Sequence, residues 1–549
     1  MSKKSIVTTG SLMILIFSVT FLSFTDRDFK LTKNLDIFFS LIREVNLFYV
    51  DEKDPEEIIR KGIEGVLSGL DPYTTYIPES EKETFETMTT GRYGGIGALV
   101  QKEGDYFLIT ELYQNFPAHK AGLKVGDVIT KIDGKSLKDI DPAEVSEMLK
   151  GTPGSSVKLT LKRQDQDSQL SLTVRRDQIK LNSVTYYGIT GNNTGYIRLS
   201  RFTEDAHKDF EDALKKLKND QSASSIIVDL RGNPGGLMKE AVLITNLFVE
   251  QGSTIVSTKG KLEQWNSEYK AEHKPVDTEI PLVVLVNGRS ASASEIIAGA
   301  IQDLDRGIIM GERTFGKGLV QTTRPLSYNA QIKITTARYY TPSGRCIQAH
   351  DFRRKGNNGT PVNIPDSLIS EFSTLNGRVV TDGGGIKPDI EIEQEMLSHL
   401  ASTMYTQNLI FDFATIYSLK NNSIAGPLEF SLTDSDYQDF IDFLDKREFE
   451  YKSQSEIKLE RLKEIAKNEN YYSLSSKEFE ALEEKLKSEI NKDLITFRDQ
   501  IQKLIEDEII GRYYFKQGQV GSSLKHDQVV YKAAEILEDD AFYHSVLTP

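Results

Sequence analysis

The chain has few of the residues that build disulfide frameworks, zinc sites or nucleic-acid surfaces. Its 549 residues include one cysteine, Cys346, and 7 histidines. A single cysteine excludes an intramolecular disulfide framework and a zinc-ribbon site, and the histidines lack the His-Glu-x-x-His spacing. The 67 Lys and Arg residues against 81 Asp and Glu residues give a formal net charge of -14, which opposes binding to a phosphate backbone. We therefore expect no metal or organic cofactor and no nucleic-acid partner.

Ordinary apolar burial has to stabilise the chain instead. Hydrophobic residues make up 38% of the sequence and charged residues 27%, which excludes a disordered or fibrous protein. A chain of this length is too long for one hydrophobic core and predicts about three to five domains.

The amino terminus reads as a membrane-targeting segment. Lys3 and Lys4 precede an uncharged and mostly apolar run from Ser5 to Thr25, about as long as the ~20 residues that span a bilayer. No clear Ala-x-Ala cleavage site follows, so a signal peptide and an uncleaved membrane anchor both stay open, beside the alternative of a buried core helix. We expect the rest of the chain to work outside the cytoplasm, in the periplasm or at the outer face of the inner membrane.

The hydrophobic pattern changes several times along the rest of the chain. Apolar residues recur at helical spacing from 31 to about 85, and short alternating strands follow from 94 to about 181. Strands and helices then alternate to about 392, which predicts an α/β core. The region after about 395 is helical and rich in charge. The predicted divisions are 1–25, 26–90, 91–180, 181–395 and 396–549.

The sheet of the α/β core is predicted to be mixed. Its strands at 319–323 and 331–337 have no helix between them, whereas parallel neighbours need a crossover connection.

The strand-rich division contains Pro117-Ala-x-x-Ala-Gly-Leu-x-x-Gly-Asp-Val-Ile129 and the following Ile132-Asp-Gly134. In these segments it resembles a PDZ domain of the bacterial, circularly permuted type. A glycine-rich turn at 93–97 has N–H groups that can converge on a peptide carboxylate, beside a strand edge that can accept an added strand. The peptide-binding candidates are Gly94, Gly95, Ile96 and Gly97 in the turn, and Val145 and Leu149 on one helical face. A plain tight turn and ordinary core packing are the alternatives for these residues.

The first stretch with catalytic potential runs from Pro281 to Glu295, as a buried strand, a short loop and a helix. It contains serines at 290, 292 and 294. N–H groups and the positive dipole end at a helix N-terminus can stabilise an oxyanion beside such a serine. No Gly-x-Ser-x-Gly elbow is present and no histidine lies between His273 and His350, which weakens but does not exclude a Ser-His-Asp triad. Ser292 and Glu295 also fit a helix capping box.

Two further stretches complete the chemistry. Lys317 lies between two glycines at the entrance to a strand; a lysine general base needs its pKa lowered from about 10.4 to roughly 7 or 8, which burial can supply, and a solvated loop lysine is the alternative. Gln321 would share a strand face with Lys317 and could orient its amine. A glycine turn ending at Gly236 can supply a second oxyanion donor. Asp229 and Arg231, just before this turn, fit a structural ion pair.

Together these motifs resemble the carboxyl-terminal processing peptidases, or tail-specific proteases. The resemblance runs from about residue 40 to 392. It rests on the following segments: 229–236, 290–296 and 315–321, with Leu70-Asp-Pro-Tyr-Thr-Thr-Tyr76, Tyr340-Thr-Pro-Ser-Gly344 and Gly384-Gly-Ile-Lys-Pro-Asp389. It implies a serine endopeptidase that cuts proteins near their C-termini, with a crotonase-like (ClpP/crotonase type) α/β core and an inserted PDZ domain between helical terminal regions.

The resemblance also implies roles for individual residues. Ser292 is the nucleophile, Lys317 the general base and Gln321 the residue that positions the lysine. The oxyanion hole is the N–H of Ala293 with that of Gly235 or Gly236. The expected partners are proteins or peptides with free C-terminal tails, with membrane association through the N-terminal segment and a homo-oligomer as further possibilities.

Two other functions compete with this interpretation. One is a catalytically inactive PDZ scaffold on the same fold, whose helical C-terminal region recruits partners. The other is a crotonase-type acyl-CoA enzyme, which would turn over thioesters. For residues 396–549 we expect a helical assembly element, because the apolar residues recur on helical faces.

Overall fold

The computed structural model describes residues 26–164, 166, 168–355, 361–393 and 396–548. The predicted targeting segment at 1–25 lies outside them. Among the described helices, none combines the length and the apolar character needed to cross a bilayer. The chain divides into two compact units, residues 1–79 with 321–335 and residues 80–320 with 336–549.

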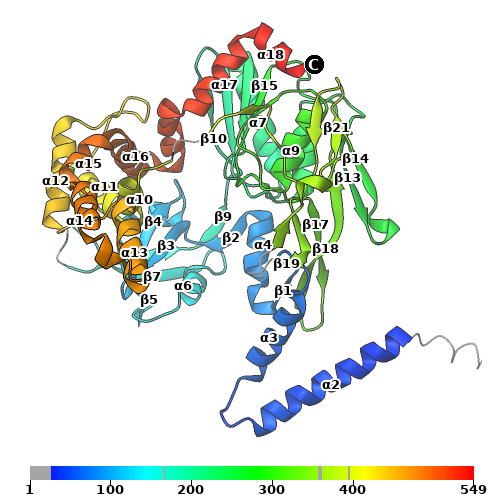
Figure 1. Ribbon diagram of the computed structural model, residues 1–549, viewed down its shortest axis with the longest axis horizontal. Helices are drawn as coiled ribbons and strands as arrows, with labels where there is room; N and C mark the ends of the chain where they lie inside the picture. Colours follow the sequence, from blue (N-terminus) through cyan, green and yellow to red (C-terminus); the bar gives the residue numbers. More distant parts are fainter. Residues whose placement is uncertain (1–25, 165, 167, 356–360, 394–395, 549) are drawn as a thin grey trace, which may run out of the picture. The chain divides into compact units, whose positions relative to one another are not determined.

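The first unit contains the predicted N-terminal helices. Helices α2 (Asp26–Phe48) and α3 (Pro55–Leu67) contact each other, and strand β1 (Thr75–Ile77) follows (Figure 1). Helix α3 begins at Pro55 because Asp54 accepts a hydrogen bond from the Glu56 N–H, which caps the first turn. Strand β1 pairs antiparallel with β18 (Gln331–Tyr340).

The second unit begins with helix α4 (Lys82–Thr90) and the strand-rich region. One sheet has the order β3-β4-β5-β7-β8, so β3 is an edge strand. Helix α6 packs against β3, and a separate ribbon joins β2 to β9. The elements are β2 (Arg92–Gly95), β3 (Ala98–Glu103), β4 (Tyr106–Leu112), α5 (Pro117–Lys120), β5 (Val128–Ile132), β6 (Lys135–Ser136), α6 (Pro142–Leu149), β7 (Ser156–Lys162), β8 (Leu170–Arg175) and β9 (Asp177–Lys180).

The α/β core follows as one sheet with helices on both faces. Its order is β10-β11-β12-β15-β16-β23, parallel throughout except for the antiparallel β10–β11 pair. Helices α7, α8 and α9 contribute to the hydrophobic cluster on one face. The elements are β10 (Val184–Thr190), β11 (Thr194–Leu199), α7 (Ala206–Asn219), β12 (Ser225–Asp229), α8 (Met238–Asn246), β15 (Leu282–Val286), α9 (Ala293–Asp303), β16 (Ile308–Gly311) and β23 (Ile390–Glu391).

The other face of this sheet is covered by the C-terminal end of the chain. Helices α17 (Gln528–Glu538) and α18 (Asp540–Leu547) pack on it, and Figure 1 shows α17 beside β15. The Tyr543 hydroxyl accepts a hydrogen bond from the Leu282 N–H at 3.0 Å. The last helices therefore complete the α/β core, although the sequence pattern groups them with the helical region.

The predicted mixed sheet is present, but for a different reason. The antiparallel strand is β10, which the sequence analysis did not predict, whereas β17 (Leu319–Pro325) and β18 join a second sheet. In this sheet β18 pairs with β13 (Thr254–Gly260), which in turn pairs with β14 (Ser267–Lys270). Two strands with no helix between them can belong to a different sheet, so the absence of a helix between β17 and β18 does not show that they join the core sheet.

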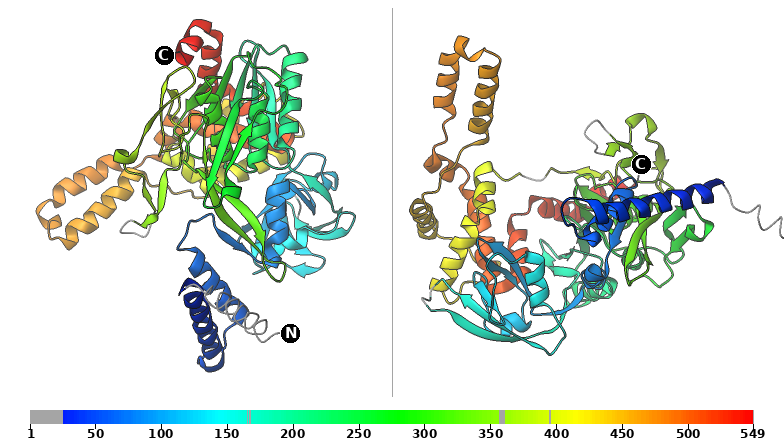
Figure 2. Two further views of the ribbon diagram at one scale, coloured as in Figure 1. Left: turned by 90° about the vertical axis from the view of Figure 1, so that its right-hand side faces the viewer. Right: turned by 90° about the horizontal axis from the view of Figure 1, so that it is seen from below.

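The helical region has its own hydrophobic core. Figure 2 shows α13 and α14 running antiparallel as a pair that extends away from the rest of this region. Helix α16 is interrupted at Phe515, where φ is 57° and ψ is -164°. The helices are α10 (His399–Thr406), α11 (Leu409–Lys420), α12 (Asp434–Lys446), α13 (Gln454–Asn468), α14 (Ser476–Leu486), α15 (Ile490–Thr496) and α16 (Arg498–Ser523).

Candidate active site

The three serines of the loop between β15 and α9 differ in accessibility. Ser290 is 0% exposed, and its hydroxyl donates to the Leu230 carbonyl at 2.8 Å. Ser294 is also 0% exposed and donates to the Asn233 carbonyl at 3.0 Å. Ser292 alone is partly exposed. Of the three hydroxyl groups, only that of Ser292 can meet a substrate without rearrangement of the loop.

Ser292 has a backbone conformation that side chains rarely adopt. Its φ is 56° and its ψ is -111°, in the left-handed half of the map, where a residue other than glycine is strained. Two side chains bond to its backbone: the Ser292 N–H donates to Oε2 of Glu295 at 2.8 Å, and the Tyr339 hydroxyl donates to the Ser292 carbonyl at 3.2 Å. The Glu295 bond is one half of the predicted capping box. Helix α9 begins at the next residue, so its positive end faces the serine.

The glycine turn lies directly against this serine. A Cβ on Gly235 would meet the Ser292 Cβ at 2.9 Å and the Ala293 nitrogen at 3.0 Å, so a side chain there would displace the serine loop. The Gly235 N–H donates to Oδ1 of Asn233 at 2.9 Å. In the described part of the chain, neither the Gly236 N–H nor the Ala293 N–H has a hydrogen-bond acceptor. Of the two glycines predicted as the second oxyanion donor, Gly236 is the one with the unpaired N–H among the described residues, and its role stays a prediction.

Asn233 joins the two loops, and the sequence analysis did not identify it. It is fully buried, and its Nδ2 donates to the Leu199 carbonyl at 2.8 Å. Its own carbonyl accepts the Ala291 N–H at 3.0 Å, in addition to the Ser294 hydroxyl. The only sequence signal was an asparagine inside a glycine turn, where such side chains commonly bond to nearby backbone.

Glu295 connects the serine loop to the lysine loop. Its Oε2 accepts the N–H of Ser292 at 2.8 Å and that of Lys317 at 2.9 Å. Its Oε1 accepts the Thr314 hydroxyl at 2.6 Å and the Gly316 N–H at 2.7 Å. Burial raises the pKa of Glu295 to about 7, while each of the four hydrogen bonds lowers it. One carboxylate oxygen thus holds the main chains of the predicted nucleophile and the predicted base next to each other.

Lys317 is partly exposed and lies in an extended loop that ends where β17 begins, at Leu319. The flanking glycines allow close backbone contacts: a Cβ on Gly316 would meet the Ala349 Cβ at 2.4 Å, and the Gly318 N–H donates to Oε1 of Gln348 at 2.8 Å. The interpretation that Lys317 and Gln321 share a strand face needs correction, because Lys317 precedes the strand.

Gln321 belongs to the first unit. Its Nε2 donates to the Thr335 hydroxyl at 3.2 Å, and this hydroxyl donates to Oδ1 of Asp71 at 3.2 Å. Asp71 also accepts the Thr74 N–H at 2.9 Å. The Leu70 to Tyr76 motif therefore fixes the strand that faces Gln321. The role of Gln321 toward Lys317 stays a prediction.

Asp229 and Arg231 form the structural ion pair that was the alternative to a functional role. The two side chains are 2.7 Å apart, and Arg231 also pairs with Asp527, the N-cap of α17, at 2.6 Å. Burial alone would raise the pKa of Asp229, but Arg231 and the Tyr196 hydroxyl hold it below its usual value. This motif anchors the C-terminal helices to the core.

The glycine-rich turn of the strand-rich region presents unpaired N–H groups. Gly94 and Gly95 lie in β2, paired with β9. Ile96 is buried, and Gly97 has a φ of 75°. Within the described chain, the N–H groups of Ile96 and Gly97 have no acceptor. Val145 and Leu149 belong to the hydrophobic core of this region, so their contact with a peptide stays a prediction.

Replacing Glu295 by glutamine is expected to lower both activity and stability. The amide group turns one accepting oxygen into a donor that faces two other donors, which should cost about 2–4 kcal/mol of unfolding free energy and reduce kcat roughly 10- to 100-fold through misplacement of the two loops. Proteolysis assays and urea unfolding measure these effects. The exposed Glu250→Gln is the control. A Glu295→Gln enzyme with wild-type kcat would show that this carboxylate does not hold the site.

The effect of Glu295→Gln on the free energy of unfolding is expected to depend on pH. The pKa of Glu295 is raised from 4.5 to about 7, so folding takes up a proton between these values. The contribution of this group to the free energy of unfolding is present below pH 4.5 and is lost as the pH rises through about 7. The stability advantage of the wild type over Glu295→Gln should therefore shrink between pH 5 and pH 8.

A partly exposed serine at a helix N-terminus, beside a glycine turn and in one chain with a PDZ-like sheet, is the arrangement of a serine-type peptidase that carries a PDZ domain. Comparison with known families agrees. The model described as "Peptidase family S41" matches residues 193–356, "PDZ domain" matches 108–163, and "Probable PDZ-protease, C-terminal helical domain" matches 400–537.

Two individual relatives give the same result. The "Carboxy-terminal-processing protease" of Bartonella bacilliformis is 36% identical over 343 residues, which are 62% of this chain and 77% of that protein. The "Carboxy-terminal processing protease CtpA" of Bacillus subtilis is 32% identical over 368 residues, 66% of this chain and 77% of that protein. A solved structure, "Photosystem II D1 C-terminal processing protease", is 29% identical with a TM-score of 0.35, covering 65% of this chain and 87% of that chain. The chain belongs to the carboxy-terminal processing protease family, a group of S41 serine peptidases.

Proposed function

We propose that this protein is an endopeptidase that cleaves proteins after binding their C-terminal tails, with Ser292 as nucleophile and Lys317 as general base. The observation that carries the proposal is the shared Glu295 carboxylate, which brings the Ser292 and Lys317 main chains together. The burial of Ser290 and Ser294 supports Ser292 as the reactive serine. No step of this chemistry requires a metal or an organic cofactor.

The proposed reaction has two halves. The Lys317 amine takes the proton of the Ser292 hydroxyl as Oγ attacks the substrate carbonyl carbon, and the carbonyl oxygen becomes an oxyanion. The N–H groups of Ala293 and Gly236 donate to this oxyanion. Collapse of the intermediate breaks the C–N bond, and the lysine gives its proton to the leaving amine. Water then attacks the acyl-serine with the lysine again as base, which releases the new C-terminus and restores the serine. Gln321 orients the lysine amine.

The PDZ domain is proposed to read the substrate tail. The unpaired N–H groups of Ile96 and Gly97 can bind a terminal carboxylate, and β3 has a free edge beside α6 for an added antiparallel strand. Val145 and Leu149 belong to α6, which contacts β3, and would contact the last apolar side chain. The recognition therefore needs a free carboxylate.

Blocking the substrate C-terminus should slow cleavage. We expect C-terminal amidation of an unstructured substrate with an apolar tail to lower kcat/KM about 10- to 100-fold. The amidated tail has no carboxylate to accept charge-assisted hydrogen bonds, which are worth roughly 1.5–3 kcal/mol. The test is cleavage of matched amidated and free peptides by the full chain. A substrate with an amidated side-chain carboxylate far from the tail is the control. Equal rates with both tails would contradict C-terminal recognition.

Three finer assignments belong to the same proposal. The crotonase-like relationship of the core follows from the family resemblance. An extracytoplasmic location follows from the apolar run at 5–25, whether this run is a cleaved signal or an anchor. Assembly into a homo-oligomer through the helical region stays a hypothesis.

A further inference from the structure

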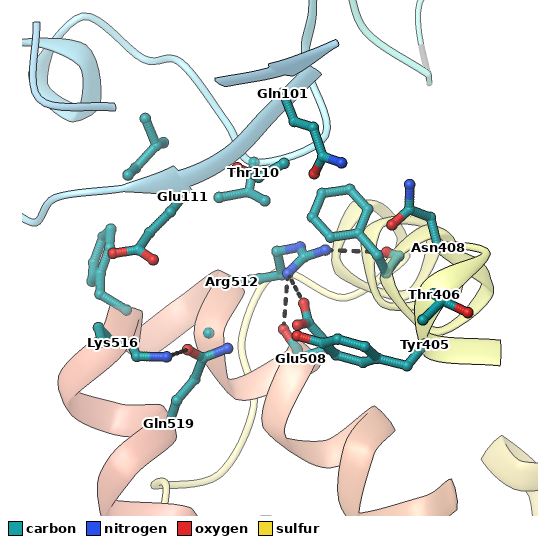
Figure 3. A pocket seen from close by; sticks show the side chains of 15 residues that line it. Gln101, Thr110, Glu111, Tyr405, Thr406, Asn408, Glu508, Arg512, Lys516 and Gln519 are labelled. Atoms are coloured by element: carbon teal, nitrogen blue, oxygen red, sulfur yellow. Dashed lines mark hydrogen bonds and ion pairs between the residues drawn. The ribbon is translucent and has the colours of Figure 1, made fainter. Parts of the chain in front are cut away.

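A polar cavity lies between the PDZ sheet and the helical region, away from the serine loop. Its volume is about 420 Å³. Figure 3 shows Gln101 and Glu111 pointing into it from β3 and β4, opposite Glu508, Arg512 and Lys516 of α16. The cavity thus combines the strand edge that receives a tail with side chains from a region outside the PDZ domain.

On the α16 side of the cavity, the charge of Arg512 is compensated by an ion pair. The Arg512 side chain is only 5% exposed and pairs with Glu508 at 2.7 Å. It also donates to the Phe411 carbonyl at 3.1 Å and the Thr415 hydroxyl at 3.2 Å. Lys516 is exposed to solvent and donates to Oε1 of Gln519 at 3.4 Å, so solvent screens its charge.

Among the described residues, the Glu111 carboxylate forms no ion pair of its own and interacts with Lys516 only through their charges. It is partly buried, and within the described chain its carboxylate accepts no hydrogen bond. Burial raises its pKa, Lys516 lowers it from a distance, and Glu508 raises it further. A partly desolvated carboxylate without hydrogen-bond donors is stabilised by a bound cation.

The strand register places a bound tail within reach of Glu111. Leu99 of β3 lies opposite Glu111, and Gln101 opposite Leu108. Residues directly opposed in antiparallel strands point to the same face, so a tail residue opposite Leu99 or Gln101 would project toward the cavity. Strands lie about 4.8 Å apart, which puts the tail backbone roughly 10 Å from β4 and requires a long side chain. The 46% exposed Leu99 offers an apolar surface for its methylene groups.

We propose that this cavity is a second specificity pocket for substrate tails, in which Glu111 binds the lysine or arginine side chain of a residue a few positions before the C-terminus. The proposal rests on the proposed addition of tails to β3. It assigns to the helical region a share in substrate choice, because α16 forms the far wall of the pocket.

The test measures peptide binding to the full-length Ser292→Ala protein by fluorescence anisotropy. Peptides share one apolar, free C-terminus and carry lysine, alanine or glutamate at each of the second to sixth positions from the end. At one of the inner positions we expect lysine to bind about tenfold more tightly than alanine. Glu111→Gln should remove this preference and leave the alanine peptide unchanged. Asp105→Asn, an exposed carboxylate on the same hairpin that pairs with Lys138 at 3.3 Å, should change neither.

The variant Lys516→Ala distinguishes a basic peptide side chain in the cavity from an acidic one. For a bound lysine side chain, removal of Lys516 should keep or raise affinity, since one nearby positive charge is lost. A preference for glutamate that Lys516→Ala abolishes would overturn the proposal, as would a lysine preference that survives Glu111→Gln. If the alanine peptides fail to bind at all, the proposed binding of substrate tails is wrong. If they bind but lysine is preferred at none of the tested positions, only the proposal of a second specificity pocket is wrong.

Discussion

Ser292→Ala is expected to leave no measurable cleavage of an unstructured protein with an apolar tail. Loss of a catalytic serine that works with a base typically lowers kcat by about 10⁴- to 10⁶-fold, whereas one lost hydroxyl on a partly exposed residue should barely change stability. Gel-based cleavage at matched enzyme concentrations measures the first effect, and thermal unfolding followed by circular dichroism measures the second.

The neighbouring serines provide matched controls for this result. Ser290→Ala removes the bond to the Leu230 carbonyl, and Ser294→Ala removes the bond to the Asn233 carbonyl. Each should cost about 1 kcal/mol of stability and keep most of the activity. An active Ser292→Ala, or an inactive but folded Ser290→Ala, would show that another serine is the nucleophile.

Lys317→Ala should lower kcat/KM about 10²- to 10⁴-fold, the usual contribution of a general base. Lys317→Arg is the decisive companion, because arginine keeps the positive charge but does not lose its proton at accessible pH. If the lysine acts as a base, both variants are equally inactive. The measurement is the initial rate of cleavage by the full-length variants, with the same apolar-tailed substrate as in the Ser292 experiment.

The pH profile gives a second readout for the lysine. A base must be unprotonated, so wild-type kcat/KM should rise toward alkaline pH and the residual activity of Lys317→Ala should lack this rise. Substantial activity in Lys317→Arg would mean that the lysine only supplies charge. In that case the inactive-scaffold hypothesis would still fail, because the protein would cleave its substrate.

Local patterns were enough to predict many elements of the fold. Strand β5 (Val128–Ile132) lies in the predicted strand-rich stretch from 94 to about 181, and helix α9 (Ala293–Asp303) follows the predicted strand and loop of 281–295. Both signals lie within a short window: alternation of apolar residues for the strand, and a serine cap followed by small and apolar residues for the helix. The PDZ strands and the parallel part of the core sheet follow from similar patterns.

Contacts between distant segments could not be predicted in this way. Glu295 was interpreted only as the partner of Ser292 in a capping box, yet two of its hydrogen bonds reach Thr314 and Gly316. Gln321 was placed by strand alternation, although the hydroxyl of Thr335 and the carboxylate of Asp71 determine its surroundings. Such bonds depend on which loops meet in the folded chain, and neither spacing nor composition records that.

The position of α17 and α18 determines when the enzyme can become complete during synthesis. The strands between 194 and 311 leave the ribosome early, but one face of their sheet is covered by side chains from residues 520 to 547. Chains are made from the N-terminus at about 5–20 residues per second, so this face stays uncovered for at least ten seconds or so. The serine and lysine loops are attached to that sheet. A chain made in this order completes the core that carries these two loops only after residues 520–547 have been synthesised.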